Sequence, residues 1–111
     1  MIKVLRAGFW VAMLALLGMS AASRAAGPAP GELVIDVRTQ GEYSGGHYPG
    51  AKNIPFDVIG ARIEELTEDR SQPIALYCRS GRRASVALQT LNAMGYTNVT
   101  NYGGLSDIST P

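Results

Sequence analysis

Residues 74–83 decide the fold, and they read Ile-Ala-Leu-Tyr-Cys-Arg-Ser-Gly-Arg-Arg. The first four are apolar and follow Pro73, a pattern typical of a short buried strand. The polar, glycine-containing segment after Cys78 indicates a loop. From Arg83 onward, apolar residues recur at helical spacing as far as Gly95, which suits the C-terminal cap of a helix. The stretch therefore predicts a buried strand that ends in a cysteine, followed by a short loop and a helix.

The same alternation of strand and helix extends outward in both directions. Short apolar runs predict strands at 33–37 and 74–77, and further strands are expected at 52–55 and 96–102. Helices are predicted at 39–43, 57–68 and 83–94, with a last half-helix at 105–110 after a turn at 103–104. This order indicates an α/β domain with a mainly parallel central sheet flanked by helices. Because sites in such sheets lie beyond the carboxyl ends of the strands, Asp36 and Cys78 are expected at one edge.

The N-terminal 26 residues predict a secretory signal peptide that precedes a single domain at 27–111. Lys3 and Arg6 come before an apolar run at 8–17, and small residues follow it. Cleavage is expected after Ala22, Ala25 or Ala26. The uncharged stretch between Arg6 and Arg24 has 17 residues, at the short limit for a membrane span, so a retained anchor is the alternative. The signal peptide predicts an exported, periplasmic protein.

The charge of residues 27–111 argues against a nucleic-acid-binding protein. Seven basic side chains face nine acidic ones there, which gives a net charge of −2. Nucleic-acid binding requires a basic face. No cofactor is predicted, and we expect a monomer.

Cys78 is the single cysteine and His47 the single histidine of the chain. A lone cysteine excludes a disulfide within the chain, and the absence of a Cys-x-x-Cys motif argues against a thioredoxin-type oxidoreductase. One cysteine and one histidine are too few ligands for a structural zinc site, so no metal is predicted. His47 lies in a turn, where we expect a structural role. The remaining alternatives for Cys78 are an inert buried thiol and a reactive one.

The residues after Cys78 favour the reactive thiol. A short glycine-containing loop can direct several backbone N–H groups at the sulfur, and the following helix adds the positive end of its dipole. Arg79, Arg82 and Arg83 add formal charge, and all of these features favour thiolate over thiol. Such a thiolate can attack phosphorus or sulfur. Cysteine phosphatases place five residues between cysteine and arginine, whereas four separate Cys78 from Arg83, which disfavours attack on phosphorus.

Several separated motifs resemble those of the rhodanese-domain family, in the same order and spacing. The first motifs are Asp-Val-Arg at 36–38, Glu-Tyr at 42–43 and Gly-His-Tyr-Pro-Gly-Ala-Lys-Asn-Ile-Pro at 46–55. The segment 78–83 resembles the six-residue active-site loop of the family, and Gly-Gly-Leu at 103–105 resembles a segment near its C-terminal end. Leu105 stands where a tryptophan often follows the paired glycines. The resemblance covers residues 31–108 and implies a three-layer rhodanese-like domain.

The resemblance also implies a thiosulfate sulfurtransferase. Cys78 would attack the outer sulfur of thiosulfate, release sulfite and hold the sulfur as a persulfide until cyanide or a thiol accepts it. The substrate-binding residues would be those of the loop: Arg79, Ser80, Gly81, Arg82 and Arg83. Asp36 and Arg38 are expected to support the edge of the site rather than to touch substrate.

Electrostatics explain why the arginines matter to this chemistry. A thiolate about 4 Å from a doubly charged thiosulfate is repelled by about 2 kcal/mol in water and by roughly 8 kcal/mol at an effective dielectric constant of 20. Arg79 is the first candidate to offset this repulsion and Arg82 the second, whereas Arg83 is expected to turn along the helix. The alternative functions are a cysteine-dependent phosphatase or arsenate reductase, a non-catalytic binding module, and a persulfide carrier for a protein partner.

Overall fold

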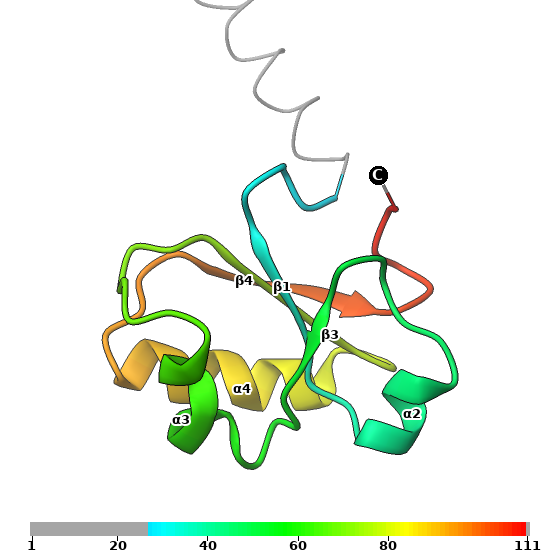
Figure 1. Cartoon of the computed structure of the whole chain (residues 1–111), viewed down its shortest axis with the longest axis horizontal. Helices are drawn as coiled ribbons and strands as arrows, with labels where there is room; N and C mark the ends of the chain where they lie inside the picture. The colour runs from blue at the N-terminus through cyan, green and yellow to red at the C-terminus, as the bar shows by residue number, and fades with distance from the viewer. Residues whose placement is uncertain (1–26, 111) are drawn as a thin grey trace, which may run out of the picture.

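The structure is a computed structural model that describes residues 27–110, so the predicted signal peptide lies outside the described residues (Figure 1). Four strands form one sheet in the order β2-β1-β3-β4, and every neighbouring pair is parallel. The strands are β1 (Leu33–Asp36), β2 (Lys52–Asn53), β3 (Ile74–Cys78) and β4 (Val99–Gly104). The helices are α2 (Gln40–Ser44), α3 (Ile59–Arg62), the 3-10 helix η1 (Ile63–Glu65) and α4 (Arg82–Ala93). The predicted α/β class with a parallel sheet is confirmed.

Alternating side chains of the strands build a separate hydrophobic cluster on each face of the sheet. On one face, Leu76 and Cys78 of β3 pack with buried side chains of α3, η1 and α4. On the other face, Tyr77 packs with the segment around Tyr48 and Ala51 and with the C-terminal segment. Because side chains alternate along a strand, the neighbouring residues Tyr77 and Cys78 belong to different faces.

Several predicted elements differ from those in the structure. The strand predicted at 52–55 ends at Asn53, and the strand predicted at 96–102 is shifted and runs from Val99 to Gly104. The helix predicted at 57–68 is wrong in extent, because only α3 and η1 form there and neither has a side-chain N-terminal cap. The turn predicted at 103–104 is wrong, because both glycines continue β4 and Gly104 pairs with Cys78. The half-helix predicted at 105–110 is a short turn, in which the Asp107 carboxylate accepts from the Gly104 N–H at 2.9 Å.

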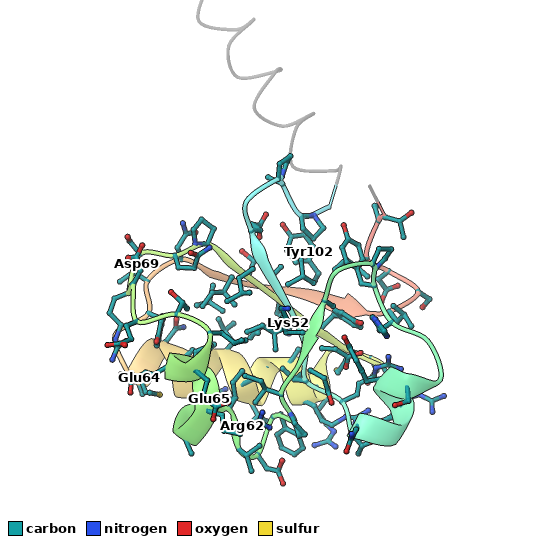
Figure 2. The ribbon with its side chains drawn as sticks, viewed as in Figure 1. Lys52, Arg62, Glu64, Glu65, Asp69 and Tyr102 are labelled. Atoms are coloured by element: carbon teal, nitrogen blue, oxygen red, sulfur yellow. The ribbon has the colours of Figure 1, made fainter. Side chains whose placement is uncertain are left out.

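The charged side chains of the α3–η1 segment lie away from the core. Figure 2 shows Arg62, Glu64 and Glu65 on the outer side of this segment, where all three are exposed. Glu64 pairs with Arg70 at 3.0 Å and Glu65 with Arg62 at 3.5 Å. Among residues 27–110, no helix is long and apolar enough to cross a membrane.

Candidate active site

Cys78 is the last residue of β3, at the carboxyl end of the sheet, and only 1% of it is exposed. The chain then turns through residues 79–81 and enters α4 at Arg82. Gly81 makes this turn with a φ of +96°, a backbone conformation that favours glycine. Its N–H donates a hydrogen bond to Cys78 Sγ at 2.9 Å. The loop therefore directs its backbone at the sulfur and places the sulfur at the N-terminal end of α4.

The environment of the thiol favours its ionised form. Burial raises the pKa of the Cys78 thiol, but the backbone N–H groups of Ala84, Ser80, Gly81 and Arg83 together lower it by more. The net result is a pKa below the ordinary value of a cysteine. The loop thus has the geometry of an anion nest around the Cys78 sulfur.

The end of β4 supports the loop from the side. Asn101 Nδ2 donates to the Gly81 carbonyl at 3.0 Å, and the Asn101 side-chain oxygen accepts from the Gly103 N–H at 2.8 Å. A Cβ on Gly104 would collide with the Arg79 carbonyl oxygen. Gly104 is therefore required for close backbone approach to the loop, whereas Gly103 has a φ of +90°, a backbone conformation that favours glycine. The interpretation of the two glycines as a turn is wrong.

The three arginines of the loop differ in their surroundings. Arg83 donates two hydrogen bonds to Glu42 of α2, Nη1 to Oε1 at 2.8 Å and Nη2 to Oε2 at 3.1 Å. Arg79 is exposed over 75% of its side chain and approaches the same carboxylate at 3.9 Å. Arg82 is exposed and makes no ion pair among the described residues. The expectation that Arg83 turns along its own helix is wrong, since it crosses to α2.

Glu42 is the site residue that sequence reasoning missed. Its carboxylate also accepts from the N–H and the hydroxyl of Thr39, which is the N-cap of α2. Hydrogen bonds from Arg83 first, and then from Thr39, lower the pKa of Glu42 to about 2, so it is anionic at neutral pH. The signal in the sequence is the capping-box spacing, Thr39 followed three residues later by Glu42.

Asp36 and Arg38 lie at the same edge of the sheet but belong to a different network. Arg38 donates to the fully buried Asp36 carboxylate from Nε and Nη2, at 2.7 to 3.1 Å. The Tyr77 hydroxyl donates to Asp36 at 2.8 Å and accepts from the Tyr48 N–H at 2.9 Å. No hydrogen bond or ion pair joins this network to Cys78 within the described part of the chain. The hydrogen bonds of this network connect the segments at the edge of the sheet to one another.

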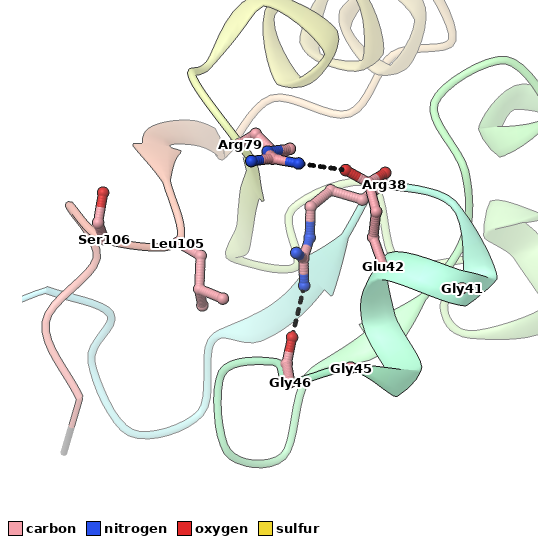
Figure 3. A pocket seen from close by; sticks show the side chains of 8 residues that line it. All are labelled: Arg38, Gly41, Glu42, Gly45, Gly46, Arg79, Leu105 and Ser106. Carbon is pink, nitrogen blue, oxygen red and sulfur yellow. Dashed lines mark hydrogen bonds and ion pairs between the residues drawn. The ribbon is translucent and has the colours of Figure 1, made fainter.

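A cleft of about 550 Å³ borders the loop on the side of α2, and Figure 3 shows the residues that line it. Arg79 stands at its rim beside Glu42, and Arg38 reaches across it to the Gly46 carbonyl at 2.7 Å. Leu105 forms the opposite wall, and its N–H donates to the Cys78 carbonyl at 2.9 Å. Cys78 itself does not line this cleft, so the cleft lies beside Cys78 and does not enclose its sulfur.

His47 is held by contacts of a structural kind. Its ring stacks on Tyr43 with 3.7 Å between centroids, and its Nδ1 lies 2.9 Å from the Tyr43 carbonyl oxygen. Within residues 27–110, no group of three or more histidine, cysteine, aspartate or glutamate side chains could hold a metal ion.

Comparison with known proteins agrees with this geometry. Residues 20–110 match the family described as the rhodanese-like domain. The thiosulfate sulfurtransferase PspE of Escherichia coli is 42% identical over 77 residues, which is 69% of this chain and 74% of that protein. A sulfurtransferase of Allochromatium vinosum is 38% identical over 65% of each chain. A solved structure described as a rhodanese with anions from E. coli has a TM-score of 0.69 and 41% identity, over 72% of this chain and 94% of that one.

Proposed function

The chain belongs to the rhodanese-like domain family and is a sulfurtransferase, and on this premise we propose that its donor is thiosulfate and its sulfur carrier Cys78. The observation that supports Cys78 as the carrier is the position of its sulfur in a nest of backbone N–H groups, with the Gly81 N–H at 2.9 Å. Such a nest stabilises the thiolate, which is the nucleophilic form of a cysteine. The PspE relative carries thiosulfate in its name, which supports that donor.

The proposed cycle has two steps of nucleophilic attack on sulfur. In the first, the Cys78 thiolate attacks the outer sulfur of thiosulfate, a new S–S bond forms, and the sulfur–sulfur bond of thiosulfate breaks. Its electron pair leaves with sulfite, and Cys78 holds a persulfide. In the second, cyanide or a thiolate attacks the outer sulfur of the persulfide, and Cys78 leaves as a thiolate. The backbone N–H groups that lower the pKa of the Cys78 thiol favour its thiolate, so the cycle does not depend on a separate base to activate the nucleophile.

Arg79 and Arg82 are the proposed contacts for the anionic donor. Both are exposed, and they flank Ser80 and Gly81, whose backbone N–H groups face the sulfur. Their charges offset the repulsion of roughly 8 kcal/mol that a thiolate and a dianion experience about 4 Å apart at a dielectric constant of 20. Arg83 acts less directly, because Glu42 binds its guanidinium group through two hydrogen bonds.

The same contact argues against a phosphatase or arsenate reductase. In those enzymes the arginine that closes the loop has to bind the oxyanion, and here Arg83 is engaged with Glu42. The loop is also one residue shorter than a phosphatase loop requires. Turnover of an aryl phosphate by the purified protein would contradict this assignment.

We further propose that residues 1–26 are a secretory signal peptide and that the domain at 27–111 works as a monomer in the periplasm. The basic start, the apolar run and the small residues before Ala26 support export. The N-terminal sequence of protein recovered from the periplasm tests the proposal. A chain that keeps Met1 and remains with the membrane would contradict it.

The covalent step is tested by mass spectrometry of the protein after incubation with thiosulfate. We expect the mass of one added sulfur atom on Cys78, and its loss as thiocyanate forms when cyanide is added. Cys78→Ser should show neither result, whereas Ser109→Ala, at an exposed position outside the loop, should behave as the wild type does. Sulfur transfer that persists in Cys78→Ser would refute the assignment.

A further inference from the structure

Glu42 connects α2 to the loop that holds the proposed nucleophile, although 41 positions separate it from Arg83. Its two carboxylate oxygens bind the two terminal nitrogens of Arg83, and Arg79 Nη1 lies 3.9 Å from Oε2 (Figure 3 shows this last contact). The side chains of Glu42 and Arg83 are 23% and 18% exposed, so the pair is partly shielded from water. The Glu42 carboxylate therefore forms ion pairs with two of the three loop arginines.

The charge of the loop is consequently lower than its sequence indicates. Three arginines lie within residues 79–83, and Glu42 is the acidic side chain paired with them among residues 27–110. The low pKa of Glu42 keeps it anionic throughout the neutral range. The pKa of Arg83 is raised, first by its hydrogen bonds to Glu42 and further by the Cys78 thiolate, which places Arg83 within electrostatic reach of the sulfur.

We propose that Glu42 is a positioning residue that limits the positive charge around Cys78, so that the loop attracts an anionic sulfur donor without retaining the anionic product. The proposal rests on the proposed function for its substrate, thiosulfate. The donor and the product sulfite are both anions, and the same charges attract both. A loop with more positive charge would bind thiosulfate more tightly but would also release sulfite more slowly.

Glu42→Gln tests the charge with little change of structure. Glutamine also serves at the third position of a capping box, so the hydrogen bonds to Thr39 at the start of α2 can be retained. Glu42→Asp keeps the charge on a shorter side chain. Glu68→Gln is the matched control, because it removes the same charge from an exposed residue in the segment before β3, at the other end of that strand from Cys78.

The direct measurement compares alkylation of Cys78 by iodoacetate and by iodoacetamide. Both reagents need the thiolate, so the ratio of their rates cancels the thiolate fraction and reports the potential that an anion meets at the sulfur. A unit charge on the order of 8 Å away, at an effective dielectric constant of about 40, changes this ratio about fivefold. We expect Glu42→Gln to raise the iodoacetate-to-iodoacetamide ratio about fivefold at low salt, and added salt to reduce the effect.

Steady-state kinetics supply the second measurement. For Glu42→Gln we expect a lower KM for thiosulfate, by up to about 25-fold because the donor carries two charges, and stronger inhibition by sulfite. The kcat should not rise, since sulfite leaves more slowly. A purely structural role for Glu42 would instead raise the KM and leave sulfite inhibition unchanged or weaker.

The outcomes of these measurements distinguish the proposed role of Glu42 from the proposed function of Cys78 as the sulfur carrier. A ratio that is unchanged in Glu42→Gln, or that rises equally in Glu68→Gln, would overturn the role of Glu42 even if Cys78 accepts sulfur from thiosulfate. A fivefold change in a protein that forms no persulfide would refute the proposed function and leave the role of Glu42 in place. Should Glu42→Gln fail to fold alone, Arg83→Gln is compared with the double variant Glu42→Gln/Arg83→Gln, in which the ratio should be higher because the Glu42 charge is absent; equal ratios in the two would overturn the role of Glu42.

Discussion

Tyr77→Phe should destabilise the domain strongly, although it removes a single oxygen atom. The Tyr77 hydroxyl donates to Asp36 Oδ2 at 2.8 Å and accepts from the Tyr48 N–H at 2.9 Å, and the residue is fully buried. It therefore joins β1, β3 and the segment that leads to β2. Phenylalanine would leave a buried N–H without its acceptor and remove one donor from the Asp36 carboxylate.

The contacts give the magnitude of the loss. A hydrogen bond to a charged group contributes about 1.5–3 kcal/mol, and a buried donor left unsatisfied costs about 1–3 kcal/mol. These contributions overlap, so we expect the free energy of unfolding to fall by about 3 kcal/mol. A domain of this size loses about 4–8 °C in Tm for each kcal/mol, which predicts a decrease of roughly 12–24 °C.

Urea unfolding of the wild type and the variant measures the loss, and Tyr102→Phe is the matched control. The Tyr102 hydroxyl is partly buried and donates to Glu32 over a longer distance of 3.3 Å, so its removal should cost less than about 1 kcal/mol. A loss below about 1 kcal/mol in Tyr77→Phe, or one equal to the control, would refute the reasoning. A large loss of sulfur transfer at unchanged stability would instead mean that Asp36 and Arg38 act on the substrate.

Three further predictions concern the loop and its surroundings. Because the nest lowers the pKa of Cys78, iodoacetamide alkylation should rise with pH and reach half its maximum below the value of about 8.5 of an ordinary thiol; a midpoint at or above that value would contradict the nest. Gly104→Ala should reduce the rates of alkylation and sulfur transfer at least tenfold, because its Cβ collides with the Arg79 carbonyl. Gly41→Ala is the control, since a Cβ there meets no atom within 4 Å. Equal rates in the two variants would contradict the requirement for close approach at Gly104. The folded-state pKa of Glu42 is about 2 against 4.5 in its unperturbed state, so the stability advantage of the wild type over Glu42→Gln should be constant above about pH 5, decrease as the pH falls from there, and be lost as the pH falls through about 2. An advantage in urea unfolding that is as large at pH 2 as at pH 7 would contradict that linkage.

The elements that the sequence predicted well are those whose pattern is local. The apolar run before Cys78 and the helical spacing after Arg83 are complete within about twenty residues, and β3 and α4 form there. The helix predicted at 57–68 followed the same kind of spacing, but it lacks a side-chain cap and its regular part ends at η1. The residues at 103–104 predicted a turn because glycine suits turns, whereas Gly104 is required for close approach to the loop backbone, a contact that depends on tertiary structure.

The charge of the site shows most clearly that local sequence patterns do not identify contacts made by the tertiary structure. The sequence places three arginines after Cys78 and predicts that Arg79 and Arg82 meet an anion while Arg83 turns along its helix. Only the fold brings Glu42 against Arg83, which it pairs with at 2.8 Å, while Arg79 stays exposed at 3.9 Å from the same carboxylate. Arg82 is exposed and makes no ion pair among the described residues. A partner 41 positions away cannot be recognised from spacing alone, and the capping box of α2 holds Glu42 in the orientation that reaches it.

The pleat of β3 explains how one edge of a small sheet can be both rigid and reactive. Tyr77 and Cys78 are neighbours in sequence, but their side chains belong to opposite faces. Tyr77 fixes the edge through Asp36 and Tyr48, whereas Cys78 faces the N-terminal end of α4 and the N–H groups of the loop. A deletion of one residue in β3 would exchange the two faces and bury the thiol beside the Asp36 carboxylate, where a thiolate would be repelled. The register of β3 therefore determines that Tyr77 supports the edge of the sheet while Cys78 faces the loop.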